Sequence, residues 1–129
     1  MLVTREMILQ QDIGLNGTLF GGDMMARMDK ASGIFAGLLS HNSRFVTLKV
    51  SELFFHSPVH AGDIVEFHAV VSRQGHTSLG IALEVLVYNP ASNGRREVTS
   101  GEFVMVAVND AGEPESIRWK PDLLAQAGA

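Results

Sequence analysis

The chain has 129 residues, of which 46% are apolar, and 14 acidic against 10 basic side chains give it a formal charge of −4. This length fits one domain with its own core, and the acidic balance argues against binding to nucleic acid. The sequence has no cysteine, which excludes disulfides and thiolate chemistry, and no apolar run of membrane-spanning length. We therefore expect a cytoplasmic domain that does not bind membranes.

The first predicted elements are a short strand, a loop and one long helix. Residues 1–11 alternate weakly, as in an edge strand, and four glycines within 12–22 predict an irregular loop. From about 22 to 39 the apolar side chains follow a helical period that no proline interrupts. The apolar stripe of this helix consists of Met24, Met28, Ala31, Phe35 and Leu38.

After a polar break, the pattern becomes that of β-strands. Four strands are predicted at 46–55, 64–72, 79–87 and 96–109, and the short turns between them favour antiparallel neighbours. The phase of the last strand slips near Gly101, which predicts a bulge or a bend there.

These elements predict an α+β fold, in which one long helix covers an antiparallel sheet of five or six strands. No internal repeat or second domain is evident, so 1–129 is expected to form one domain, with 110–129 as a surface tail. One helix leaves part of the apolar surface uncovered. We therefore expect a subunit interface.

The predicted helix has a second face, made of small residues around one carboxylate. Its members at helical spacing are Gly22, Ala26, Asp29, Gly33 and Ala36. Small residues let another backbone approach closely, so the carboxylate of Asp29 needs hydrogen-bond donors or a water-filled pocket. One interpretation is that Asp29 only bonds to a neighbouring loop.

The other interpretation is catalytic. Gly21 and Gly22 stand at the start of the helix, where free N–H groups favour an anion or a polarised carbonyl oxygen, and Asp29 follows two turns later. Donors beside a carboxylate are what hydrolysis of an acyl compound requires. We predict no metal site, because His56 and His60 flank Pro58 and share no helix face.

The segment 16–29, Asn-Gly-Thr-Leu-Phe-Gly-Gly-Asp-Met-Met-Ala-Arg-Met-Asp, resembles the start of hot-dog-fold acyl-CoA thioesterases. It is most similar to brain acyl-CoA hydrolase and its bacterial single-domain relatives. Further matching segments are Val46-Thr47, 55–58 followed by Gly62-Asp63, and 75–78, so the resemblance covers about 8–108.

The resemblance implies a central helix wrapped by a curved antiparallel sheet, with the active site between two subunits of a dimer that assembles into a tetramer or hexamer. It implies acyl-CoA as the substrate, with coenzyme A as part of that substrate and no separate cofactor. The aspartate that matches Asp29 is catalytic in this family, and the amides of Gly21 and Gly22 face the thioester carbonyl. Relatives carry an asparagine where this chain has Gly14, so Asn16 becomes the candidate for its role.

The resemblance also implies where coenzyme A binds. The residues carried over for this are Thr47, Gly75, Thr77 and Ser78. Arg44 and Arg73 lie at predicted strand ends and are candidates for phosphate binding, although ordinary surface arginines are equally expected there. Candidates for lining the acyl pocket are Met24, Met25, Met28 and Phe54.

We therefore predict an acyl-CoA thioester hydrolase in which Asp29 activates water, with direct attack by Asp29 as the second route. Two other functions stay open. One is an acyl-CoA-binding protein without turnover, which Gly14 favours. The other is a hydratase or dehydratase, which would use a histidine that the segment 12–29 lacks.

Overall fold

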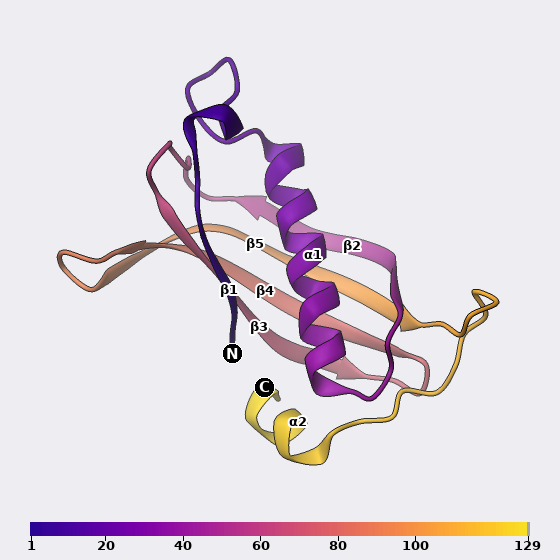
Figure 1. Ribbon diagram of the computed structural model, residues 1–129. Coiled ribbons are helices and arrows are strands. Elements are labelled where there is room, and N and C mark those ends of the chain that lie inside the picture. Colours follow the sequence, from indigo (N-terminus) through magenta and orange to yellow (C-terminus); the bar gives the residue numbers. More distant parts are fainter. Residues whose placement is uncertain (129) are drawn as a thin grey trace.

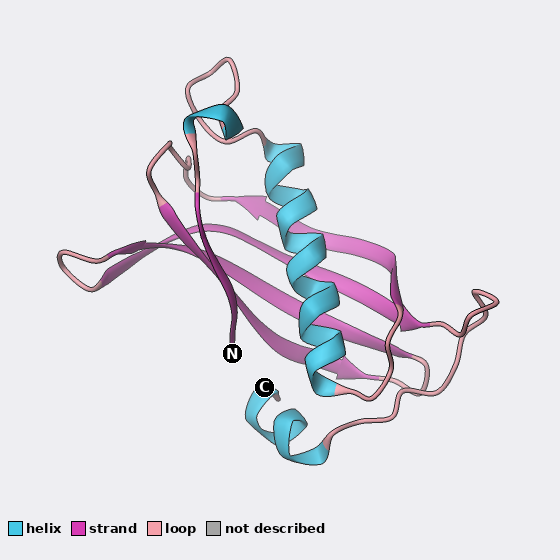
Figure 2. Ribbon diagram, viewed as in Figure 1, coloured by secondary structure: helices cyan, strands magenta, loops and turns pink. Residues whose placement is uncertain are grey.

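A computed structural model describes residues 1–128 of the chain. A long helix lies across one face of a curved antiparallel sheet, whose strand order is β1-β3-β4-β5-β2 (Figure 1, Figure 2). The predicted α+β fold is therefore confirmed, and of the five or six strands predicted the sheet has five. The elements in chain order are β1 (Leu2–Met7), the 3-10 turn η1 (Gln10–Asp12), α1 (Gly21–Leu39), β2 (Phe45–Phe55), β3 (Ile64–Gln74), β4 (Ser78–Asn89), β5 (Gly94–Ala107) and α2 (Pro121–Ala127).

The core lies between α1 and the sheet. Four of the five predicted stripe residues of α1 are buried, from Met24 to Phe35. The fifth prediction was wrong, because Leu38 is 44% exposed and Leu39, four residues after Phe35, takes its place in the core. Either residue continues a helical stripe, and the direction in which α1 crosses the sheet selects Leu39.

The irregularity predicted near Gly101 is present, but as a bulge in the neighbouring strand β2, while β4 pairs with Gly101 in regular register. The register between β2 and β5 shifts between Ser51 and Phe54, opposite Gly101, and Glu52 in this bulge has a φ of 51°. A Cβ on Gly101 would lie only 3.1 Å from Leu53 Cδ1 and 3.3 Å from a Met28 methyl group. The missing side chain therefore lets β2, β5 and α1 pack closely where the sheet bends.

A buried carboxylate fastens β1 to the sheet. Glu66 on β3 has no exposed surface and accepts hydrogen bonds from Arg5 on β1, Arg95 on β5 and the nearby His68, at 2.5–2.9 Å. The hydrogen bond from Arg95 lowers the pKa of Glu66, burial opposes this, and the bonds from His68 and Arg5 help to bring the pKa to about 2. This network therefore stabilises the edge of the sheet that lies farthest from β2.

The prediction of a surface tail at 110–129 is wrong for the part from Ile117 to Gly128, which packs against the domain, while 110–114 are exposed. Ile117 is buried, α2 contacts α1 and β3, and Ala127 at the end of α2 is 1% exposed. Isolated bridges join Ser40 to Trp119 and Val71 to Gly128. Residue 129 lies outside the described part. No helix within 1–128 combines the length and hydropathy needed to cross a membrane.

Candidate functional site

Asp29 lies on the exposed side of α1, and its carboxylate has one side-chain partner. The Thr47 hydroxyl of β2 donates a hydrogen bond to Asp29 Oδ1, and the same hydroxyl lies 3.4 Å from Met105 Sδ. Asp29 is therefore held by a strand of the sheet and not by a neighbouring loop. Because both Asp29 and Thr47 are exposed, the carboxylate is oriented and still open to a reactant.

The first amides of α1 are free. The carbonyl oxygen of Phe20 accepts hydrogen bonds from the N–H groups of Asp23 and Met24, both at 3.0 Å. The N–H groups of Gly21 and Gly22 have no hydrogen-bond partner within residues 1–128. They point out of the helix start, where the helix dipole is positive, and so form a pair of donors for a carbonyl oxygen or an oxyanion.

Two aromatic rings flank these glycines. A Cβ on Gly21 would lie 3.3 Å from Phe55 Cζ, and a Cβ on Gly22 would lie 2.9 Å from Phe20 Cε2. The two rings are themselves largely in solvent, with Phe20 70% and Phe55 53% exposed. The glycines therefore leave room for two apolar surfaces beside the free amides.

A hollow of about 380 Å³ opens beside Gly21. Its lining residues come from the loop before α1, from α1, from the end of β2 and from β5: Thr18, Leu19, Gly21, Met24, 55–59 and Thr99. Of the four predicted acyl-pocket residues, Met24 lines this hollow, while Met28 is fully buried in the core and Phe54 lines a different pocket. The contributions of Phe55, Val59 and Thr99 were not predicted.

An arginine joins the segments that lead into α1. Arg27 forms ion pairs with Glu6 of β1, with Asp12 of η1 at 3.2 Å and with Asp23 of α1 at 3.2 Å. Burial lowers the pKa of Arg27, but hydrogen bonds to Glu6 and Asp23 outweigh it, so this pKa lies above its ordinary value. Asp12 also accepts the N–H of Leu9 at 2.8 Å. Arg27 thus fixes the turn before the glycine-rich loop to the first turns of α1.

Asn16 lies at the tip of that loop, in a turn where the N–H of Gly17 donates to the Gly14 carbonyl. Asn16 is exposed, and Leu15 beside it is completely exposed. The loop extends beyond the start of α1 (Figure 1), so Asn16 does not lie beside Asp29 of the same chain.

The predicted coenzyme A-binding residues gather at the end of the sheet away from the hollow, where Thr47 pairs with Met105 of β5 and Ser78 pairs with the next residue, Val106. A Cβ on Gly75 would lie 2.6 Å from the Ser78 carbonyl oxygen, so the β3–β4 turn requires glycine there. Arg73 donates to Ser78 Oγ at 3.0 Å, and the Thr77 carbonyl accepts the N–H of Ala107.

Arg44 lies at this same end of the sheet. Its carbonyl oxygen accepts the N–H of Val108 just after β5, and its exposed guanidinium lies 3.9 Å from the carboxylate of Asp110. Both Arg44 and Arg73 are exposed at the surface, with side chains within reach of an anion.

Within one chain, these groups form two separate halves. At 1.5 Å per residue, Asp29 lies about 12 Å along α1 from Gly21. The free N–H groups point away from Asp29, so a carbonyl bound to them lies farther from Asp29 than the amides themselves. One half thus holds the donor pair and the hollow, and the other holds Asp29 with Thr47.

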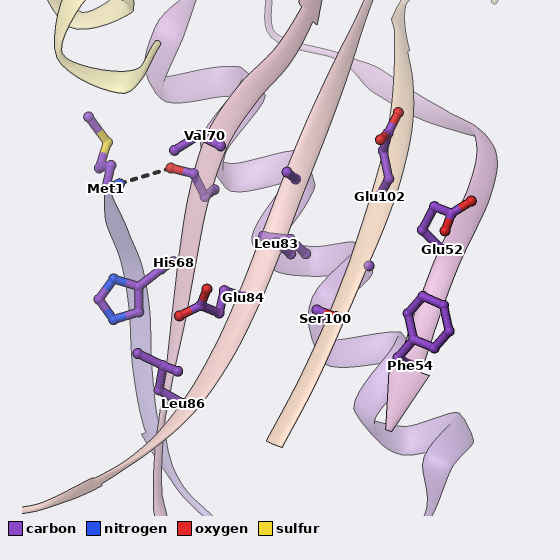
Figure 3. A pocket seen from close by; sticks show the side chains of 13 residues that line it. Met1, Glu52, Phe54, His68, Val70, Leu83, Glu84, Leu86, Ser100 and Glu102 are labelled. Atoms are coloured by element: carbon purple, nitrogen blue, oxygen red, sulfur yellow. Dashed lines mark hydrogen bonds between the residues drawn. The ribbon is translucent and has the colours of Figure 1, made fainter. Parts of the chain in front are cut away.

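A further hollow, of about 460 Å³, lies on the face of the sheet opposite α1 (Figure 3). The view shows His68, Glu84, Ser100 and Glu102 on β3 to β5, with Glu52 and Phe54 on β2. Its three glutamates have no ion-pair partner within residues 1–128. Their negative charge repels phosphate groups, so this hollow does not suit coenzyme A.

Comparisons with known proteins bear on this arrangement. Residues 16–90 match the family model of the thioesterase superfamily. The chain is 37% identical to the acyl-CoA thioester hydrolase YciA of Salmonella typhimurium, over 90% of this chain and 89% of that protein.

Solved structures of similar proteins agree with the fold. One is the aspartate-to-alanine mutant of a hexameric broad specificity acyl-coenzyme A thioesterase, at 32% identity and a TM-score of 0.89, covering 98% of this chain and 94% of that one. Another is an acyl-CoA hydrolase of Staphylococcus aureus in complex with butyryl coenzyme A and coenzyme A, at 25% identity and a TM-score of 0.82, covering 90% and 70%.

Proposed function

Because this chain belongs to the thioesterase superfamily, we propose that it hydrolyses acyl-coenzyme A to free coenzyme A and a carboxylic acid. The observation that carries the proposal is the pair of free amides at the start of α1, on the same helix as an oriented and exposed carboxylate. The relative from Staphylococcus aureus, which holds butyryl coenzyme A, supports the substrate class.

In the proposed reaction, the thioester oxygen accepts hydrogen bonds from the N–H groups of Gly21 and Gly22. Asp29 removes a proton from water, and the water oxygen bonds to the carbonyl carbon. The amides stabilise the negative charge that develops on the thioester oxygen. The carbon–sulfur bond then breaks, and the thiolate takes up the proton from Asp29. In direct attack, an Asp29 oxygen bonds to the carbonyl carbon and the thiolate leaves, which gives a mixed anhydride. If ¹⁸O-water then attacks the Asp29 carbonyl of this anhydride, a single turnover places ¹⁸O in the enzyme.

A complete site needs two copies of the chain. The donor pair of one α1 and the carboxylate of the same α1 are about 12 Å apart and face away from each other. In an antiparallel pair of helices related by a two-fold axis near Met25 and Ala26, Gly21 of each copy meets Asp29 of the other. The exposed small residues Gly22 and Ala26 would allow this approach.

The free edge of β2 supports such a pair. In the sheet, β2 pairs only with β5, and three apolar residues on its outer face, Val46, Leu48 and Val50, are 36–68% exposed. Edge strands of this kind pair with another chain. The relatives described as hexameric support further assembly of such dimers.

The proposed coenzyme A-binding residues complete the half that holds Asp29. Arg44 stands one residue before β2 and precedes Thr47, the partner of Asp29, by three residues, so the arginine lies about 10 Å along the chain from the residue that holds the carboxylate. Arg44, Arg73 and Ser78 would bind the phosphate groups of coenzyme A, while the thioester reaches the amides of the other copy.

The test measures free thiol released from acyl-coenzyme A by the wild type and by Asp29→Asn, which keeps the size of the side chain. We expect at least a 100-fold loss of kcat in the variant, and we expect folding to be unchanged because Asp29 is exposed. Full activity of a folded Asp29→Asn would refute its role. No thiol release by the wild type would refute the proposed function, and a changed acyl chain without thiol release would indicate a hydratase.

Mixing two inactive variants tests the shared site. When Asp29→Asn and Gly21→Pro are co-expressed, half of the dimers are mixed and each mixed dimer has one intact site, so about a quarter of wild-type activity should return. Either variant expressed alone is the control. No recovery in a mixed dimer isolated with two tags would refute a site built from two copies.

A further inference from the structure

We infer that the hollow beside Gly21 binds the acyl chain, that Met24 forms its floor, and that the preferred substrates carry uncharged acyl groups of short to medium length. This inference rests on the proposed function, because it assigns a part of the same site. It adds which residues set the length and the chemistry of the acyl group.

The position of the hollow follows from the amides. Gly21 is both a lining residue of the hollow and one of the two free donors. A thioester oxygen held at these amides places the carbonyl carbon at the mouth of the hollow. One substituent of that carbon is the sulfur, which must lead out towards coenzyme A, and the other substituent, the acyl chain, can enter the hollow.

The inner surface of the hollow is apolar. Leu19, Met24 and Val59 are 9%, 2% and 3% exposed, so they form buried walls and a floor, while half-exposed Phe55 stands at the entrance. The N–H of Leu19 donates to the Val59 carbonyl at 2.8 Å, which fixes two of the walls to each other. The site is therefore formed before a substrate binds.

Two polar side chains of the lining, those of His56 and Ser57, already have partners on β5. His56 Nε2 lies 2.9 Å from Ser100 Oγ and 3.3 Å from a Glu97 carboxylate oxygen. Ser57 donates to the Glu97 carbonyl at 3.0 Å. No lysine or arginine is among the lining residues, and the nearby Arg96, which donates to Ser57 Oγ at 2.6 Å and to the Pro58 carbonyl at 3.1 Å, is already paired with Asp63 at 3.7 Å. A charged acyl group, such as succinyl, would lose its hydration without gaining a counter-charge, so the hollow selects against it.

The volume sets an upper limit on chain length. At about 30 Å³ for a water-sized group, 380 Å³ holds about a dozen such groups, and this limits the chain to about a dozen carbons. Each methylene that enters the hollow should raise kcat/KM about fourfold until the hollow is full. Beyond that length, further carbons add nothing.

The experiment measures kcat/KM for acetyl- to palmitoyl-coenzyme A, and for succinyl-coenzyme A, with three proteins. These are the wild type, Met24→Ala, and Met28→Ala as the matched control, since Met28 is an equally buried methionine one turn further along α1 that does not line the hollow. Met24→Ala should increase, by two to three carbons, the acyl-chain length at which kcat/KM stops rising. Met28→Ala should lower Tm and leave that chain length unchanged. Succinyl-coenzyme A should react at least 100-fold more slowly than butyryl-coenzyme A.

The outcomes separate this inference from the proposed function. If the wild type hydrolyses acyl-coenzyme A but Met24→Ala and Met28→Ala have the same chain-length profile, the acyl chain does not reach Met24 and the inference fails alone. If no thioester is hydrolysed, the proposed function fails. Should Met24→Ala not fold, Val59→Ala enlarges the same hollow by about two methyl groups and should move that chain length in the same direction by a smaller amount.

Discussion

The free N–H of Gly21 can be removed without disturbing the start of α1. Gly21→Pro deletes this donor at the first helical position, where proline is favoured because its fixed φ suits the helix. Phe20 before it has φ −65° and ψ 136°, the extended conformation that a residue before proline adopts. The added Cβ would lie 3.3 Å from Phe55 Cζ, and that half-exposed ring is free to turn away. We therefore expect the variant to fold.

The matched control is Gly21→Ala, which adds the same Cβ and keeps the N–H. Loss of one oxyanion donor lowers kcat by about 10²- to 10³-fold. Thiol release at saturating butyryl-coenzyme A should therefore show this loss for Gly21→Pro and only a few-fold loss for Gly21→Ala, with similar Tm values for both. Equal kcat values for the two variants would refute the assignment of Gly21 as an oxyanion donor.

Three further predictions concern stability and assembly. The pKa of Glu66 falls from 4.5 to about 2 on folding, so its carboxylate stabilises the protein above pH 4.5 and this stabilisation disappears as the pH falls towards 2. In urea unfolding, the free energy of unfolding of Glu66→Gln should therefore be about 3 kcal/mol lower than that of the wild type at pH 7 and almost equal to it at pH 2. A difference that does not depend on pH would contradict this. Arg27→Gln leaves three carboxylates facing one another, so both Tm and kcat should fall. Added salt should restore part of the Tm, because it screens the repulsion between these carboxylates. An unchanged kcat would show that the site does not depend on Arg27 holding the loop before α1 in place. Leu48→Lys, at a side chain 68% exposed on the edge of β2, should give an inactive monomer in sedimentation, and an active monomer would refute the shared site.

The long helix and the strands could be predicted because their signals are local. The helical period of α1 and the alternation of β2 to β5 repeat over enough residues to be recognised, and their ends were placed within about three residues. α2 was missed because its seven residues make only two turns. Pro121 at its first position and Asp122 in its first turn are the signals that could have revealed it.

The candidate site likewise contains residues that a local sequence pattern predicts and contacts that no local pattern predicts. Asp29 and the two glycines follow from one continuous segment, so sequence alone predicts them together. The partner of Asp29 is Thr47, 18 residues away, and the ring against Gly21 belongs to Phe55. These contacts depend on how β2 packs beside α1 after the bulge at Glu52, and no local pattern in the sequence records that path.

The direction of the free amides is the reason why, in the proposed function, a helix that carries both donors and a carboxylate would need a second copy. Amides at a helix start always point away from the rest of their own helix, so no substrate bound to Gly21 can meet Asp29 of the same chain. A two-fold pair turns this geometry into two sites at once, each with a complete set of groups. The hollow, in contrast, belongs to one chain. Dilution into monomers should therefore abolish turnover and leave the chain-binding hollow intact, so a monomeric Leu48→Lys should still bind a medium-chain fatty acid while releasing no thiol.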